Sequence, residues 1–419
     1  MLVYVINREG KPLMPCSPGK ARRLLRRGKA KVARKDPFVI KLSFGSSGYK
    51  QEVIGGIDSG SKVIGSGAVG NGKVFYQSEI SLRGEEIRKN MDQRKMYRRS
   101  RRGRKTRYRK ARFLNRSAST KKGRLAPSVN HKVEAHLREK KFMEKILPIA
   151  KWLVEVAQFD IHRITNPEVK GAGYQDGNKK GFYNAKAYVL HRDDYKCQKC
   201  RAKNCALHVH HIIFRSKGGT DSPENLITLC KICHDNLHQG KFEIKAKKSK
   251  TSHATEVNMV TSQLRKSGWP FEETYGFETK LKREALGLPK AHYLDAVVIC
   301  LKEGESVDSL DGFLVKRLVS KGDYQQTKGA RSSMRIPTGK LFGLRKFDRV
   351  KTPKGVGFVK GKRSSGYFAI GNMDGKVIAS SVNVKKDTER LGARKVVLTE
   401  RRSAFLPAMN GGVSCAQKG

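Results

Sequence analysis

The sequence contains no run of 18 or more apolar residues, and its first residues, MLVYVINREGK, lack the long apolar stretch of a secretory signal. Because a membrane-spanning helix needs about 20 apolar residues, the chain is not expected to cross a membrane. Acidic residues are also scarce: 37 Asp and Glu stand against 89 Lys and Arg, and the formal net charge is +52. A charge of this size is typical of proteins that neutralise many phosphates, so a nucleic acid is the first partner to expect.

The amino-acid composition indicates how many domains to expect but does not identify a function. Apolar residues make up 37% of the 419 residues, so the chain can form real cores and is expected to divide into two or three domains. Charge alone does not separate an enzyme from a ribosomal or histone-like packaging protein, because it reports phosphate contact and not chemistry. We expect an intracellular protein, in which eight cysteines would not pair as four disulfides.

Four of the cysteines form two C-x-x-C pairs, Cys197 with Cys200 and Cys230 with Cys233. Two such pairs, about 30 residues apart, supply the four thiolates that a tetrahedral structural zinc ion needs. The simpler interpretation, buried or redox-active cysteines, does not explain two matched pairs. The remaining cysteines are expected to be free thiols: Cys16, Cys205, Cys300 and Cys415.

Between the two pairs, the segment LHVHHIIFRSKGGTDSPENLITLCKICHDNLH has an order of His-His, Asn and Cys-His that resembles the ββα-metal motif of HNH endonucleases. The resemblance implies phosphodiester hydrolysis, with His211 as the general base on water. His210 and His234 would hold one Mg ion, and Asn225 would orient the catalytic loop. Many HNH proteins have Asp at the place of His210, so the ligand atoms stay open.

Other interpretations of these histidines remain. His208 and His238 are expected to be bystanders, although His238 could substitute as a ligand. His210 and His211 could instead be extra zinc ligands of a structural finger, but four cysteines already satisfy a zinc ion. An HNH fold can bind and nick DNA by itself, so this module does not identify the whole protein.

Three carboxylates stand in apolar segments, where an unpaired charge is costly to bury. Asp58 lies in GGIDSGS, Glu155 in WLVEVA and Asp295 in HYLDAVVIC. An RNase H-like nuclease draws such acids from separate elements to hold two divalent ions. His292, three residues before Asp295, would share a helix face with it. Each acid alone is more often a cap or an ion-pair partner, but together they predict a metal site. Two alternatives rank lower: Asp160 and Glu278.

The expected elements describe an α/β multidomain protein. A short basic helix lies between strands in residues 1–50, and three β-rich runs up to residue 82 read as the start of an RNase H-like sheet. Residues 83–124 carry 19 Lys or Arg against three acids and are expected to form one long arginine-rich helix. Further on, we expect a strand over YGFETKLKREAL, a helix over AHYLDAVVICLKEG, and a small basic β-barrel after about residue 320.

The order of these parts is similar to that of the IscB family, transposon-associated RNA-guided nucleases related to the CRISPR effectors with HNH domains. The similarity is carried by KPLMP at Lys11 to Pro15, GIDSGSK, the arginine-rich segment, VEVAQFD, the HNH insert and GLPKAHYLDA. It implies a RuvC-type, RNase H-like core split into three segments. The implied domains are a PLMP domain (1–50), RuvC-I (51–82), a bridge helix (83–124), RuvC-II and a linker (125–185), the HNH domain (186–240), a linker and RuvC-III (241–318), and a C-terminal domain that contacts RNA and a target-adjacent motif (319–419).

The resemblance also implies partners and roles. A guide RNA, the omega RNA, would pair with one strand of a double-stranded DNA target beside a short adjacent motif. The HNH site would cut the paired strand with one Mg ion, and Asp58, Glu155, His292 and Asp295 would cut the displaced strand with two Mg ions. The protein would be a monomer in a ribonucleoprotein of the prokaryotic cytoplasm, on the nucleoid when bound to DNA. The arginines expected to hold the guide backbone are Arg94, Arg98, Arg99, Arg101, Arg102, Arg104, Arg107, Arg109 and Arg112.

Two other classes of protein fit part of the sequence. A protein-only HNH or resolvase-like nuclease would need no RNA, but it leaves the arginine-rich segment 83–124 unexplained. A non-catalytic RNA-binding protein would use the charge, but it leaves Asp58, Glu155, Asp295 and His211 without a role. The sequence therefore favours an RNA-guided nuclease with two metal-dependent sites.

Overall fold

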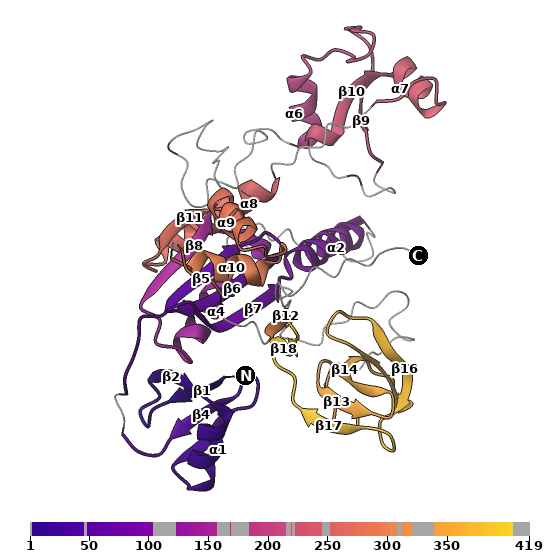
Figure 1. The fold of residues 1–419 in the computed structure, drawn as a ribbon. Helices are drawn as coiled ribbons and strands as arrows, with labels where there is room; N and C mark the ends of the chain where they lie inside the picture. Colours follow the sequence, from indigo (N-terminus) through magenta and orange to yellow (C-terminus); the bar gives the residue numbers. More distant parts are fainter. Residues whose placement is uncertain are drawn as a thin grey trace, which may run out of the picture. The chain divides into compact units, whose positions relative to one another are not determined.

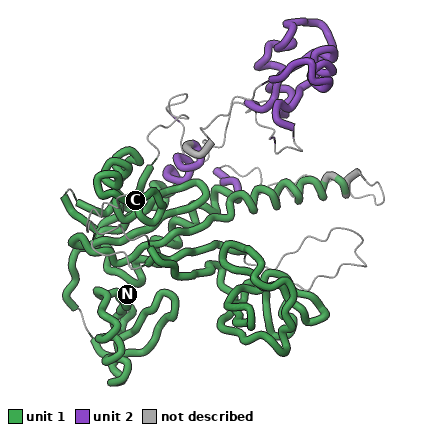
Figure 2. Tube along the Cα trace, turned by 45° about the vertical axis from the view of Figure 1, so that its right-hand side comes forward, with its two compact units in different colours: residues 1–110, 127–158, 263–419 green, residues 111–126, 159–262 purple. Residues whose placement is uncertain are grey.

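A computed structural model describes residues 2–45, 48–103, 123–156, 168, 184–214, 219, 223–244, 252–302, 304–307, 312–320 and 339–404. The chain forms two compact units (Figure 2). The first contains residues 1–110, 127–158 and 263–419, and the second contains residues 111–126 and 159–262. None of the helices that the structure describes is both long enough and apolar enough to span a membrane.

The first unit begins with a small four-stranded sheet in the order β2-β1-β4-β3, with one helix. Its elements are β1 (Val3–Ile6), β2 (Pro12–Cys16), α1 (Pro18–Arg26), β3 (Ala30–Arg34) and β4 (Val39–Leu42). The helix begins where the Ser17 hydroxyl accepts a hydrogen bond from the Lys20 amide, 3.3 Å away. Strands β2 and β3 were not expected from the sequence. β2 tolerates Pro12 and Pro15 because it lies at the sheet edge, where a missing N–H costs little.

The centre of the first unit is a seven-stranded mixed sheet in the order β11-β8-β5-β6-β7-β12-β18 (Figure 1). β5, β6 and β7 form an antiparallel meander, β8 and β11 continue it in parallel beside β5, and β12 runs parallel to β7. The strands are β5 (Ile54–Ser59), β6 (Val63–Gly70), β7 (Lys73–Ser81), β8 (Lys151–Val156), β11 (Glu272–Tyr275), β12 (Phe313–Leu318) and β18 (Val397–Arg402).

One helix, α10 (His292–Cys300), packs directly on this sheet (Figure 1). Glycines make the close contact: a Cβ at Gly65 would lie 1.8 Å from the His292 carbonyl oxygen, and a Cβ at Gly56 would lie 2.3 Å from that of Ala296. Any larger side chain would push the helix away. The glycine pattern of β5 and β6 therefore brings the first turn of α10 down onto the end of β5.

Helix α4 (Pro127–Glu144) brings a buried carboxylate to β6, β7 and β12. Glu139 accepts hydrogen bonds from Ser66, Ser78 and Tyr76, and Lys316 donates to both of its oxygens at 2.7 Å. Burial of an ion pair is tolerated when all its polar atoms are satisfied, as they are here for the carboxylate. This network joins α4 to strands that come from distant parts of the sequence.

The strand expected over YGFETKLKREAL is wrong. The strand β11 ends at Tyr275, and the segment forms helix α9 (Gly276–Ala285) after helix α8 (Ser252–Lys266). The buried residues of α9, Thr279 and Arg283, are four apart, which is a helical and not a strand period.

The Glu278 carboxylate accepts hydrogen bonds from the Thr274 hydroxyl at 3.0 Å and the Tyr275 amide at 3.5 Å, so this lower-ranked candidate acid is a helix cap.

The C-terminal part contains a five-stranded antiparallel sheet in the order β16-β15-β14-β13-β17. Its strands are β13 (Arg349–Thr352), β14 (Gly355–Gly361), β15 (Tyr367–Gly371), β16 (Val377–Asn383) and β17 (Glu389–Gly392). Val350, Val359, Phe368 and Ile370 form its core. The next strand, β18, leaves this sheet and pairs with β12, so the segment from 319 onward contributes to two sheets.

The second unit contains a β-hairpin followed by a helix. Its elements are α6 (Ala185–Arg192), β9 (Leu207–His211), the 3-10 turn η4 (Pro223–Asn225), β10 (Leu226–Cys230) and α7 (Lys231–His238). The hairpin and α7 together form the ββα order expected from the sequence. Cys197, Leu229, Cys230 and Cys233 are buried at its centre.

Candidate functional site

The first unit gathers the four acid-site residues expected from the sequence. Asp58 lies at the end of β5, and the parallel register of Ile57 with Val154 places Glu155 beside it on β8. α10 supplies His292 and Asp295 from its first turn. Asp58 is 6% exposed and Asp295 is 7% exposed, so both carboxylates are removed from bulk water.

His292 and Arg283 hold two of these carboxylates. The His292 Nδ1 donates a hydrogen bond of 2.5 Å to Asp58 Oδ2, and this bond raises the pKa of His292. The Arg283 Nε lies 2.9 Å from Asp295 Oδ1. That ion pair lacks the angle of a hydrogen bond, and both atoms are buried without a hydrogen-bond partner among the described residues. Asp295 Oδ1 therefore retains a lone pair that an additional cation can use.

The acids also act on one another. Burial, together with the negative charges of Asp58 and Asp295, raises the pKa of Glu155 to about 7. Burial and the Asp58 charge likewise raise the pKa of Asp295, against the Arg283 charge. Like charges that repel in a buried site are the setting in which a divalent cation is most strongly held. The oxygen donors fit Mg²⁺, which prefers carboxylates.

The acids do not yet enclose an ion in this conformation. Within the part of the chain that the structure describes, two groups of side chains have all their ligand atoms within 4.8 Å of one another, and both belong to the second unit. Asp58 and Asp295 turn instead to His292 and Arg283. Binding of one cation by all three acids therefore requires their carboxylates to approach one another.

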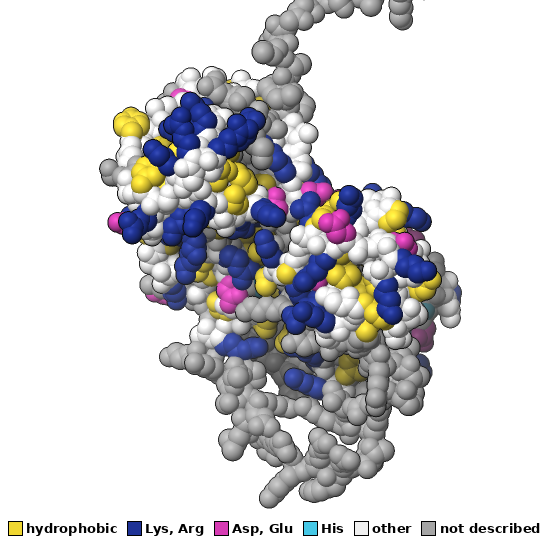
Figure 3. Space-filling view, turned by 90° about the horizontal axis from the view of Figure 1, so that it is seen from below, with side chains coloured by type: hydrophobic (Ala, Val, Ile, Leu, Met, Phe, Trp, Pro, Cys, Tyr) yellow, Lys and Arg dark blue, Asp and Glu magenta, His cyan; other side chains and the backbone are white. Residues whose placement is uncertain are grey.

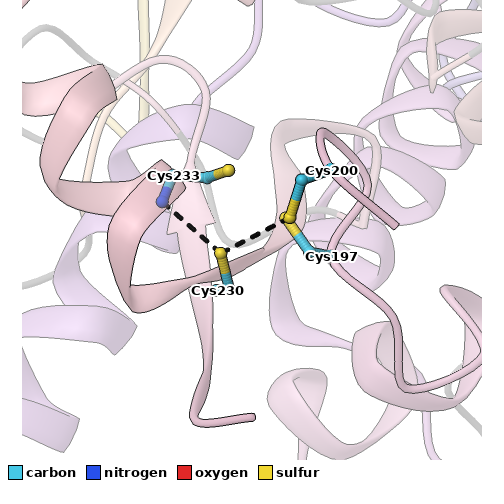
Figure 4. Close-up of side chains that lie close together, drawn as sticks. All are labelled: Cys197, Cys200, Cys230 and Cys233. Carbon is cyan, nitrogen blue, oxygen red and sulfur yellow. Dashed lines mark hydrogen bonds between the residues drawn. The ribbon is translucent and has the colours of Figure 1, made fainter. Parts of the chain in front are cut away.

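The first of the two close groups is the four cysteines, Cys197, Cys200, Cys230 and Cys233 (Figure 4). Cys200 Sγ lies 3.6 Å from Cys230 Sγ, and Cys230 Sγ accepts a hydrogen bond from the Cys233 amide, 3.4 Å away, at the start of α7. Burial raises the pKa of Cys197, but backbone hydrogen bonds around it bring the value down to about 6. One of the four sulfurs is thus a thiolate at neutral pH, as a zinc ligand must be.

The second close group is three histidines, His210 on β9 with His234 and His238 on α7. Their ring centroids are 4.5 to 5.1 Å apart, and the Nε2 atoms of His234 and His238 are 3.3 Å apart. Burial and the neighbouring imidazoles lower the pKa of His210 to about 4. It is therefore neutral at physiological pH, the state in which imidazole binds a metal.

His238 was expected to be a bystander and is instead the third member of this group. The spacing His234-x-x-x-His238 was the available signal, because residues four apart share a helix face. His208 also contacts His234, with ring centroids 5.3 Å apart, but does not belong to the group. His211 does not belong to it either.

Asn225 fixes the loop that follows His211. Its side-chain oxygen accepts a hydrogen bond from the Ile213 amide at 2.8 Å, and its side-chain nitrogen donates to the Ile213 carbonyl at 3.0 Å. Its backbone carbonyl accepts from the Ile212 amide at 2.9 Å. Three hydrogen bonds to two adjacent residues thus anchor the end of β9.

The arginine-rich segment is helical over Gly84–Gly103, whereas Gly123 and Arg124 at its end lie outside a helix. Helix α2 covers Gly84–Gly103, with Arg94 and Arg98 exposed and with Arg99, Arg101 and Arg102 along its last turns. Lys and Arg side chains are spread over the face drawn in Figure 3, with fewer carboxylates among them.

Five residues named above lie outside the described residues: Arg104, Arg107, Arg109, Arg112 and Asp160. Cys415 lies outside them as well.

Comparison with known families finds two matches in this chain. Residues 3–177 match the family described as RRXRR protein, and residues 197–240 match the family described as HNH endonuclease. The first match contains Asp58, Glu155 and helix α2, and the second contains the cysteine and histidine groups. The two matches follow one another along the chain without overlap.

Two curated proteins are similar to short parts of the chain. Anaredoxin of Nostoc sp. (strain PCC 7120 / SAG 25.82 / UTEX 2576) is 35% identical over 60 residues, which are 14% of this chain and 79% of that protein. The type IV methyl-directed restriction enzyme EcoKMcrA of Escherichia coli (strain K12) is 36% identical over 64 residues, which are 13% of this chain and 23% of that enzyme.

Proposed function

Because the chain belongs to the IscB family, which joins an RRXRR region to an HNH endonuclease domain, we propose that a guide RNA directs it to its target. Its HNH domain and its similarity to a restriction enzyme make it a nuclease that acts on DNA. The net charge of +52 and the basic helix α2 support a second, RNA partner. On this proposal, base pairing with the guide selects the target and the protein cuts both strands.

The observation that carries the proposal is the presence of two candidate catalytic centres in different units of one chain. The first unit holds Asp58, Glu155 and Asp295 on the seven-stranded sheet, and the second holds the three-histidine group beside the hairpin. A nuclease that cuts one strand needs one such centre. Two centres of different chemistry support two cuts made by separate machinery.

The central sheet supports assignment of the first centre to a RuvC-type, RNase H-like core. The strand order is β7-β6-β5-β8-β11, in which two parallel strands follow the antiparallel meander of the three β-rich runs expected to begin an RNase H-like sheet. The acids come from β5, β8 and α10, and the HNH insert separates β8 from α10 along the sequence. We assign the cut of the displaced strand to this centre.

At this centre, the residues of the chain hold cations and position groups. Asp58, Glu155 and Asp295 would ligate Mg²⁺, which when bound polarises the scissile phosphate and lowers the pKa of water. His292 orients the Asp58 carboxylate through its Nδ1–H. Arg283 balances the negative charge of Asp295 when no cation is bound.

In the HNH domain, His211 is proposed as the general base that takes a proton from water, and Asn225 holds the loop that positions it. The histidine group would hold the catalytic cation. Three imidazole ligands suit a first-row transition ion such as Mn²⁺ or Zn²⁺ better than Mg²⁺, which prefers oxygen. The single Mg²⁺ expected from the sequence is thus replaced in the proposal by a divalent ion that binds imidazole well.

The proposal is tested by strand-resolved cleavage. The protein is purified with a guide RNA and given a duplex whose two strands carry different labels. We expect cuts in both strands when the duplex matches the guide, and none when it is scrambled. Equal cutting of matched and scrambled duplexes would identify a protein-only nuclease instead.

The four cysteines predict a structural zinc ion. Purified protein should contain about one tightly bound zinc, and Cys230→Ser should lower the content to near zero and unfold the HNH domain, because binding and folding of such sites are coupled. Elemental analysis measures the content. Cys205→Ser is the matched control, since Cys205 is exposed and outside the group. Wild-type protein without zinc, or an equal loss in the control, would contradict the prediction.

The raised pKa of Glu155 predicts a pH effect on the displaced-strand cut. Below pH 7 this carboxyl is largely protonated and cannot ligate a cation, so at low Mg²⁺ the cut should strengthen as pH rises through about 7. Raising the Mg²⁺ concentration should move the midpoint down, because the cation competes with the proton. Cleavage rates at several Mg²⁺ concentrations measure this. A midpoint that does not respond to Mg²⁺ would show that another group titrates.

The third histidine predicts a metal effect on the other cut. His238→Ala should weaken the HNH cation by about 10- to 100-fold, so the guide-paired strand is cut slowly at limiting metal and recovers in excess. His208→Ala is the matched control, because it contacts His234 from outside the ligand group. Titration with Mn²⁺ compares them. If His208→Ala shows the larger shift, the ligand set is wrong.

A further inference from the structure

A pair of exposed aromatic side chains lies at the junction of β11 and α9, beside the acid centre. Tyr275 is 36% exposed and Phe277 is 46% exposed, and their rings are nearly parallel, at an interplanar angle of 16° with centroids 6.1 Å apart. Leu281, one turn further along α9, is 64% exposed. Soluble proteins rarely leave aromatic side chains together at the surface without a binding partner.

The backbone between the two rings touches the acid centre. A Cβ at Gly276 would lie 2.9 Å from the Glu155 Oε1, so only glycine fits there without displacing the carboxylate. β11 is the edge strand of the seven-stranded sheet and lies directly beside β8, which carries Glu155. The rings therefore stand on either side of a backbone position in contact with one of the proposed cation ligands.

The charges around the pair favour a polyanion. Lys280 on α9 and Lys290 after its end are exposed, and the positive charge of Lys290 acts on both Glu155 and Asp295. The nearby acids of β11 are already paired, Glu272 with Lys151 and Glu273 with Arg265. Glu284 lies 3.8 Å from Lys280 across one helical turn and only partly offsets it.

We propose that Tyr275 and Phe277 are a stacking platform for unpaired nucleotides of the displaced DNA strand as it enters the acid centre. This inference rests on the proposed function, which assigns that strand to the acids. Every base offers a π-face, so aromatic side chains bind single strands of any sequence, as guide-directed cutting requires. When a phosphate of this strand lies at the acid centre, its neighbouring bases lie beside these rings. Stacking of the bases on the rings then positions the strand for the cut.

The first test is strand-resolved cleavage by the double variant Tyr275→Ala/Phe277→Ala. We expect the displaced-strand cut to fall by about 10- to 100-fold while the guide-paired cut is unchanged, from the usual loss on removing base stacking. Phe277→Trp should retain cutting because it keeps a ring. Tyr49→Ala is the control, since Tyr49 is 85% exposed and lies far from this segment in sequence.

A change in the DNA substrate, combined with the double variant, completes a double-mutant cycle. Abasic sites beside the scissile phosphate of the displaced strand should slow the wild-type cut by a similar factor and should have little further effect on the double variant. Independent, additive losses would show that the rings and the bases do not meet. An unchanged displaced-strand cut, an equal loss of both cuts, or a change in the sedimentation of the variant would each overturn the platform.

Photocrosslinking separates failure of the platform from failure of the proposed function. A single strand with 5-iododeoxyuridine is irradiated with the full-length protein, with no guide needed, and crosslinks are mapped by mass spectrometry. We expect them in the tryptic peptide SGWPFEETYGFETK. If wild-type protein leaves the displaced strand uncut but crosslinks there, the assignment of the cut is wrong and the platform stands. Crosslinks confined to other peptides overturn the platform even if both strands are cut.

Discussion

Asp58→Ala should convert the protein into a nickase that cuts only the guide-paired strand. The displaced-strand rate should fall by about 1,000-fold or more, because a catalytic cation supplies several kcal/mol of transition-state stabilisation and this carboxylate is central to holding it. Asp58 lies between Glu155 on the neighbouring strand and His292, so its loss also frees His292 from its partner. Labelled duplexes with a matched guide measure both strands in one reaction.

The control variants separate chemistry from folding. Asp58→Asn keeps the side-chain volume and the contact with His292, and it should lose the cut nearly as completely because an amide ligates Mg²⁺ weakly. Asp36→Ala removes an exposed carboxylate, 57% exposed, from the first unit and should leave both cuts intact. Loss of both cuts in Asp58→Asn, with RNA still bound, would contradict separate centres.

His211→Ala should produce the opposite nickase. Removing a general base costs about 100- to 10,000-fold, so the guide-paired strand should remain intact while the displaced strand is cut normally. Asn225 should still hold the loop in this variant, because its hydrogen bonds to Ile213 and Ile212 do not involve the imidazole. The same labelled duplex reads the result.

His191→Ala, on helix α6 of the same domain, is the control for His211, because His191 is exposed and is not among the close histidines. Binding of guide RNA should survive in all these variants, since none removes a lysine or arginine. If His211→Ala lost both cuts while the zinc content stayed at one, the two centres would depend on each other and their separate assignment would fail.

The acid centre could be predicted from the sequence because an acidic residue stands out in a segment of apolar residues that is expected to be buried. Asp58, Glu155 and Asp295 each interrupt an apolar segment, and the structure brings all three together with His292. Arg283 was not predictable in this way. Its ion pair with Asp295 depends on α9 packing beside α10, and a charged residue in a helix of mixed composition gives no such signal.

The wrong strand over YGFETKLKREAL has a clear cause. Its apolar residues are few, and the alternation at Tyr275 and Phe277 suggests a strand, but those two side chains are exposed and do not report on the core. The buried positions, Thr279 and Arg283, are polar, so the helical period was hidden from a hydrophobic pattern. The same segment carries the proposed stacking platform, where function and not packing sets the residue types.

The pairing of strands from distant segments could not be predicted from the sequence either. β18 follows a complete five-stranded sheet, and nothing in VLTERR indicates that it returns to β12. His238 shows the reverse case: the signal existed in its spacing from His234, but the HNH resemblance gave the ligands as His210 and His234 and left His238 only as a possible substitute.

The most direct test of an RNA-guided nuclease is to sequence the RNA that copurifies with the protein and to challenge the complex with the DNA it encodes. We expect one structured RNA with a guide segment, cleavage of both strands of the complementary duplex, and loss of that cleavage when the RNA is digested and its restoration when the RNA is added back. Purified protein that carries no defined RNA and cuts the same duplex equally well after digestion would contradict the account.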